Sequence, residues 1–175
     1  MARTKTFPTV GRLQPVSYKA LPSVKAFLSR YAGYSGNVSE GTRHAVRRLC
    51  ELSLYARQLM GQVADAGFTI PPDIVYVTGS PVESGGVEDV GVNSEEPTRY
   101  GVVMIPGSIT LTPAEMEFLN RFGEGVGGGL RLMVQELVRL GDEKACAILS
   151  SLGEDDFVPP RWLDYAAAHQ PAAAP

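Results

Sequence analysis

The chain has 175 residues, of which 44% are hydrophobic and 20% are charged, so it can build a packed core and is not a disordered chain. No run approaches the ~18 apolar residues of a membrane-spanning helix, and the first residues lack the apolar segment of a secretory signal. Its two cysteines, Cys50 and Cys146, are too few for a disulfide scaffold and too isolated for a zinc site. We therefore expect a cytoplasmic protein.

The net charge of −3 conceals an uneven distribution. Residues 1–60 carry ten Lys or Arg and two acids, a net charge of +8. Residues 61–106 carry a net charge of −6, and residues 107–175 a net charge of −5. A basic segment joined to an acidic remainder predicts that a polyanion binds one part of the molecule only.

Residues 16–66, which follow a basic arm at 1–15, predict a strand and two helices. Around Tyr18 apolar and polar residues alternate, which is the period of a half-buried strand. A first helix starts near Pro22. A second helix begins at one of two N-cap residues, Asn37 or Ser39, and the apolar pattern continues to about residue 66 as one long helix.

Residues 67–106 form an inserted segment of different character. The apolar runs at 73–78 and 100–105 predict two strands. Between them, residues 79–99 are rich in Gly, Ser, Glu and Pro and predict an acidic loop.

Residues 107–141 predict a second strand-helix-helix unit. Apolar and polar residues alternate over 108–111, as in a half-buried strand. Thr112 and Glu115 have the spacing of a capping box, with Pro113 at the first helical position. A second helix follows over about 126–140, and a C-terminal extension at 142–175 begins with a short helix at 143–152.

The two units match in sequence. Residues 16–22 (VSYKALP) and 27–31 (FLSRY) correspond to 107–113 (GSITLTP) and 118–122 (FLNRF) at an offset of 91. After a difference of three residues in the next turn, 37–43 (NVSEGTR) corresponds to 125–131 (GVGGGLR) at an offset of 88. Shared residues in one order favour an internal duplication over a coincidence between two generic helical hairpins.

A short strand, a helix opened by Thr-Pro, a glycine turn and a capped second helix resemble the ribbon-helix-helix DNA-binding proteins, which include the Arc and MetJ type repressors. The closest local match is SITLTP at 108–113. In that family two strands pair into an antiparallel ribbon that enters the major groove. The resemblance implies a mainly α fold with short β-strands and two such repeats in one chain, as in tandem members. The sequence leaves open whether the strands pair within one chain or between two.

The expected function is sequence-specific binding of double-stranded DNA, as a transcriptional repressor or a plasmid or phage accessory protein in the nucleoid. Strand residues with hydroxyl or amino groups would contact bases, and the start of the second helix with nearby arginines would contact phosphates. The base-contacting candidates are Ser17, Lys19, Ser108 and Thr110. The phosphate-contacting candidates are Asn37, Ser39, Arg43, Arg47 and Arg48, with Arg3, Lys5 and Arg12 in the arm.

The sequence gives only weak support for nucleotide binding or catalysis. The GxGxxG pattern at 123–128 follows a predicted helix instead of a strand, so it does not predict a dinucleotide site. His44 and His169 are far apart in sequence, which argues against histidine catalysis. We expect no enzymatic activity, cofactor, metal ion, membrane or small-molecule substrate, and we expect a homo-oligomer. The alternative is a homo-oligomeric interaction or virion structural module that does not bind DNA.

Overall fold

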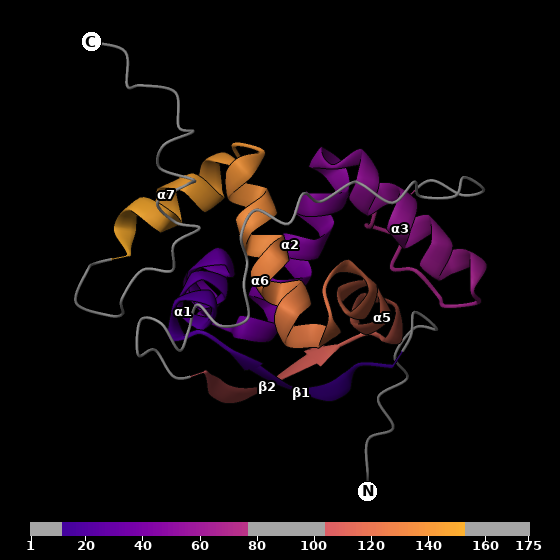
Figure 1. The fold of residues 1–175 in the computed structure, drawn as a ribbon, viewed down its shortest axis with the longest axis horizontal. Helices are drawn as coiled ribbons and strands as arrows, with labels where there is room; N and C mark the ends of the chain where they lie inside the picture. Colours follow the sequence, from indigo (N-terminus) through magenta and orange to yellow (C-terminus); the bar gives the residue numbers. More distant parts are fainter. Residues whose placement is uncertain (1–11, 77–103, 153–175) are drawn as a thin grey trace, which may run out of the picture.

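The structure is mainly helical, with one small sheet on one side of the molecule (Figure 1). It is a computed structural model that describes residues 12–76 and 104–152. Within these residues two antiparallel strands pair along one side, and the helices stand on the opposite side of the sheet. The predicted fold class, mainly α with short β-strands, is confirmed at this level.

Two segments of the chain form the same three elements. The first unit consists of β1 (Gln14–Ala20), α1 (Pro22–Tyr31) and α2 (Val38–Leu52). The second unit consists of β2 (Ile105–Leu111), α5 (Pro113–Phe122) and α6 (Gly125–Arg139). In both units the strand has 7 residues, the first helix 10 and the second helix 15.

Three further elements among the described residues are attached to these units. A short 3₁₀ turn, η1 (Gly33–Ser35), lies between α1 and α2. The helix α3 (Leu54–Asp65) follows α2, and α7 (Glu143–Ser151) follows α6. The first unit therefore has a longer connection between its two helices than the second unit has.

The strands β1 and β2 pair over their full lengths, with Ser17 opposite Ser108 at the centre of the register. Successive side chains of a strand point to opposite faces. Tyr18 and Ile109 are buried against the helices, whereas Ser17 and Lys19 point to the other face and are exposed. The sheet thus has one apolar face in the core and one polar outer face.

Pro15 and Pro106 are compatible with this sheet. Thr110, which lies opposite Pro15, donates its backbone N–H to Ser39 Oγ at 2.9 Å instead of to β1. Hydrogen-bonded and non-hydrogen-bonded pairs alternate along an antiparallel ladder. The pair formed by Pro15 and Thr110 is therefore non-hydrogen-bonded. Pro106 lies four residues before Thr110 on the same strand, so it also belongs to a non-hydrogen-bonded pair, and neither proline removes a bond between the strands.

A single hydrophobic core joins the two units. Its buried side chains come from both strands and from the helices of each unit. On α1 the rings of Phe27 and Tyr31 stack with centroids 5.7 Å apart, and on α5 the rings of Phe118 and Phe122 stack at 5.4 Å. Neither unit buries its apolar face without the other, as expected for strand-helix-helix segments of this size.

Two predicted helix starts are confirmed. Thr112 Oγ1 accepts a hydrogen bond from the Glu115 N–H at 3.2 Å, and Glu115 Oε2 accepts one from the Thr112 N–H at 2.9 Å. This reciprocal pair is the predicted capping box. At the start of α2 the N-cap is Asn37, the first of the two candidates.

The prediction of one long helix to residue 66 is wrong. The helix α2 ends at Leu52, and Ser53 has an extended backbone, with φ −106° and ψ 119°. Ser53 Oγ accepts a hydrogen bond from the Ala56 N–H at 3.2 Å. A serine hydroxyl competes with the helical backbone for such donors, so Ser53 caps α3 and interrupts the apolar pattern.

The strand predicted at 73–78 is not formed over its described part. Residues 73–76 make a turn and an irregular segment, where Ile74 is buried in the core and Asp73 forms an ion pair with Arg47. A short apolar run does not distinguish a strand from a loop that packs on a core. Residues 100–103 of the strand predicted at 100–105 lie outside the described residues, as do 77–99. Of the described part, Met104 is irregular and Ile105 is the first residue of β2.

In the ranges that the structure describes, no helix has both the length and the apolar character needed to span a bilayer.

The two helices of each unit meet at a glycine. A Cβ atom added to Gly41 on α2 would collide with the carbonyl oxygen of Leu28 on α1. A Cβ atom added to Gly129 on α6 would collide with the carbonyl oxygen of Leu119 on α5. Because the colliding atoms belong to the backbone, a larger residue at either position must push the helices apart.

We expect Gly41→Ala and Gly129→Ala each to lower the free energy of unfolding by roughly 1–3 kcal/mol, the usual cost of overpacking. Gly128→Ala is the control, because the nearest atom to its added Cβ is 3.8 Å away. That change should raise the free energy of unfolding by up to about 1 kcal/mol, since alanine favours a helix over glycine. Urea unfolding followed by circular dichroism measures all three, and equal effects at positions 128 and 129 would contradict the close approach.

Candidate nucleic-acid interface

The outer face of the sheet brings together the four predicted base-contacting residues. Ser17, Lys19 and Ser108 are exposed, and Thr110 is half-buried. All four lie on the face opposite to the buried Tyr18 and Ile109, by the alternation of the strands. The described helices all lie on the inner side of the sheet, so none of them covers the outer face (Figure 1).

The start of α2 is attached to the outer edge of β2. Asn37 Oδ1 accepts hydrogen bonds from the Ser39 N–H at 2.9 Å and from the Glu40 N–H at 3.4 Å. Ser39 Oγ in turn accepts the hydrogen bond from the Thr110 N–H. Two predicted phosphate-contacting residues, Asn37 and Ser39, therefore lie next to Thr110, a predicted base-contacting residue.

The start of α6 takes the corresponding place at the edge of β1, but with different chemistry. Glu124 occupies the N-cap position without a side-chain cap. Gly127 approaches the carbonyl oxygen of Lys19 so closely that a Cβ atom would collide with it. This end of the sheet therefore has a glycine-rich helix start with an acid beside it, where the other end has Asn37 and Ser39.

Arg43 on α2 is the predicted phosphate-contacting arginine nearest to the start of that helix. It is half-buried and forms no ion pair with the described residues. Its charge acts on Glu115, which is fully buried at the start of α5. Burial raises the pKa of Glu115, while the hydrogen bonds from Thr112 and the charges of Arg43 and Arg47 oppose this shift.

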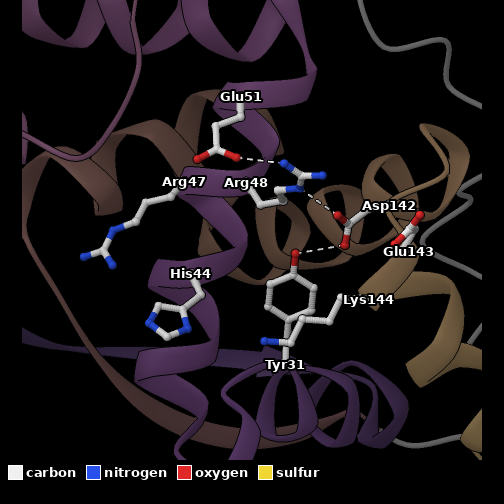
Figure 2. Close-up of a pocket in the computed structure, with 8 residues that line it drawn as sticks. All are labelled: Tyr31, His44, Arg47, Arg48, Glu51, Asp142, Glu143 and Lys144. Atoms are coloured by element: carbon white, nitrogen blue, oxygen red, sulfur yellow. Dashed lines mark hydrogen bonds and ion pairs between the residues drawn. The ribbon is translucent and has the colours of Figure 1, made fainter.

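Arg47 and Arg48 are placed differently, in an open pocket of about 430 Å³ between α2 and α7 (Figure 2). Arg47 Nε lies 2.5 Å from Asp73 Oδ2. Arg48 Nε lies 2.7 Å from Asp142 Oδ1, and Arg48 Nη1 lies 2.9 Å from Glu51 Oε2. Both arginines already have carboxylate partners, so their charge is largely compensated within the protein.

Asp142 links three helices in this pocket. Only 4% of its surface is exposed. Its Oδ2 atom accepts hydrogen bonds from the Tyr31 hydroxyl on α1 and the Ala145 N–H of α7, both at 3.0 Å. Burial and the nearby Asp142 charge raise the pKa of Tyr31. The pocket therefore holds α7 against α1 and α2, and the balanced charges that line it do not indicate a ligand.

The remaining candidates contribute less to this interface. Arg12 lies just before β1 and is exposed, whereas Arg3 and Lys5 lie outside the described residues. Cys50 is buried, and burial raises its pKa to about 12. Cys146 is half-buried. No group of three His, Cys, Asp or Glu suited to a metal ion occurs among the residues that the structure describes.

Comparison with known proteins does not assign this fold or site. No family model, no curated protein and no solved structure matches the chain.

Sequence reasoning missed the role of Asp142 in joining three helices. Asp142 precedes the predicted helix at 143–152, and an aspartate directly before a helix is a recognisable N-cap. Its contacts with Tyr31 and Arg48 join residues 94 or more positions apart, and no local pattern predicts them.

We expect Asp142→Ala to lower the free energy of unfolding by about 2 kcal/mol or more. The change removes an N-cap and leaves the Tyr31 hydroxyl and Arg48 without their acceptor. Asp142→Asn is the control, because an asparagine oxygen still caps a helix and should retain part of the stability. Thermal and urea unfolding measure both variants, and a loss below about 0.5 kcal/mol for the alanine variant would contradict the structural role.

Proposed function

We propose that this chain binds double-stranded DNA, with the paired strands β1 and β2 inserted in the major groove. The observation that carries the proposal is the sheet itself. Antiparallel pairing of strands from distant parts of the chain collects Ser17, Lys19, Ser108 and Thr110 on one face that no described helix covers. The major groove of B-DNA admits a two-stranded ribbon, and side chains of these types bind base edges there.

We further propose that the two units are repeats of one ribbon-helix-helix element. Three contacts recur between them. Gly41 meets the Leu28 carbonyl as Gly129 meets that of Leu119. The aromatic stacks on α1 and α5 occur at matching positions. The start of α2 lies on β2 as the start of α6 lies on β1. These matching contacts, and the equal element lengths, support duplication.

The local charge supports contact with a polyanion in spite of the overall net charge of −3. From Arg12 to the end of α1 the chain has four basic residues and no acid. Many acids elsewhere are compensated by ion pairs, such as Glu117 with Arg121 and Glu136 with Arg139. A protein with a negative total charge can therefore present a positive face to DNA.

Phosphate contacts would come from the start of α2. The positive end of the helix dipole favours an anion there, and Arg43, which forms no ion pair among the described residues, adds a positive charge. Arg47 and Arg48 are weaker candidates than the sequence indicated, because their carboxylate partners, Asp73 for Arg47 and Asp142 for Arg48 (Figure 2), compete with phosphate. We propose that these two arginines stabilise the tertiary structure instead.

The test is binding of the full chain to fluorescently labelled random-sequence duplex DNA, followed by anisotropy at increasing salt concentration. We expect binding at low salt and a linear fall of log K with log salt, as for proteins that displace counterions from phosphates. No binding at low salt would overturn the proposal. A large homomeric assembly that is indifferent to DNA, detected by light scattering, would instead support the structural-module alternative.

Two substitutions separate base contacts from phosphate contacts. Lys19→Ala should change which sequences bind best, because Lys19 lies on the outer face of the sheet. Arg43→Ala should weaken binding to all sequences alike and reduce the salt slope by about 1. Lys144→Ala is the control of equal charge, since α7 lies away from the sheet (Figure 1). A loss of affinity in the control as large as that of Arg43→Ala would show that only the total charge matters.

A further inference from the structure

The outer face of the sheet is nearly symmetric. Two antiparallel strands are related by a local twofold axis perpendicular to the sheet. The register places this axis between Ser17 and Ser108, which lie opposite each other. Rotation about it exchanges Pro15 with Pro106 and Lys19 with Thr110, because each residue lies two positions from its central serine.

This symmetry fails at one position of the outer face. The two prolines are identical and so are the two serines, but a lysine on β1 corresponds to a threonine on β2. Lys19 is exposed and forms no ion pair among the described residues. Its ammonium group favours the N7 and O6 acceptors of guanine. A threonine methyl group instead contacts the thymine methyl, and its hydroxyl forms hydrogen bonds with purines or pyrimidines without preference.

The helices α2 and α6 begin differently at the two ends of the sheet, and this is a second departure from symmetry. Asn37, which caps α2, and Ser39 lie at the end of the sheet that holds Thr110, whereas the arginines Arg43 on α2 and Arg131 on α6 occupy matching positions. The glycine-rich start of α6, with Glu124, lies at the end that holds Lys19. One end therefore combines a neutral outer residue with a helix start that has a capping side chain, and the other combines a cationic outer residue with a helix start that has none.

We propose that the preferred DNA site is an imperfect palindrome, in which the half-site facing Lys19 contains a guanine that the half-site facing Thr110 lacks. This inference rests on the proposed function, because it specifies how the same face reads DNA. The serine and proline positions give both half-sites the same contacts. Lys19 and Thr110 then determine which way round the protein lies on its site.

The experiment is in vitro selection from duplex DNA with a randomised central region, followed by sequencing, for the wild type and two variants. Lys19→Thr makes the outer face symmetric with threonine at both ends, and Thr110→Lys makes it symmetric with lysine at both ends. The wild type should enrich sites with the guanine in one half only, with a preference of about tenfold over the other bases. Lys19→Thr should enrich palindromes without that guanine, and Thr110→Lys palindromes with it in both halves.

The outcomes distinguish this inference from the proposed function. Wild-type sites that are perfectly palindromic, or an asymmetry that Lys19→Thr leaves unchanged, would overturn the inference while DNA binding stands. Binding without enrichment of any sequence would do the same. Absence of binding to the starting pool at low salt would overturn the proposed function and the inference together. Circular dichroism of both variants checks that the helices are retained, and Lys19→Ser replaces Lys19→Thr as the neutral variant if the latter fails to fold.

Discussion

The rest of the structure depends on the pairing of β1 with β2. These strands are separated by more than eighty residues in the chain, from Ala20 to Ile105. Their pairing places Tyr18 and Ile109 beneath the helices of both units, where burial of each large apolar side chain contributes about 1.5–3 kcal/mol. Without this pairing each unit would expose the apolar side of its helices to water.

The same pairing creates the outer face. Because side chains alternate along a strand, every pair of residues that enters the core leaves a neighbouring pair pointing outward. The central Ser17 and Ser108 are exposed for the same geometric reason that Tyr18 is buried. A shift of the register by one residue would invert both faces, so the core and the proposed DNA-reading surface are specified together.

Charged residues have two different roles in this protein. Arg48 is joined to Asp142, a carboxylate that also caps α7 and accepts a hydrogen bond from Tyr31. The positive charge of Arg48 therefore stabilises contacts between helices and is largely neutralised before any ligand could pair with it. Lys19 and Arg43 form no ion pair in the described residues, so their charge remains available. The total charge of the chain does not distinguish these roles.

Local sequence patterns predicted the elements that depend on interactions between residues close together in the chain. The Thr112–Glu115 capping box, the Asn37 cap and the alternation around Tyr18 predicted helix starts and strand faces, because these interactions join near neighbours. The break at Ser53 was missed, since the apolar period continues through it. Only the tertiary structure decided that the two strands pair within one chain, that Ser39 contacts Thr110, and that Arg47 and Arg48 face carboxylates. These contacts join residues far apart in sequence, whose proximity depends on how the whole core packs.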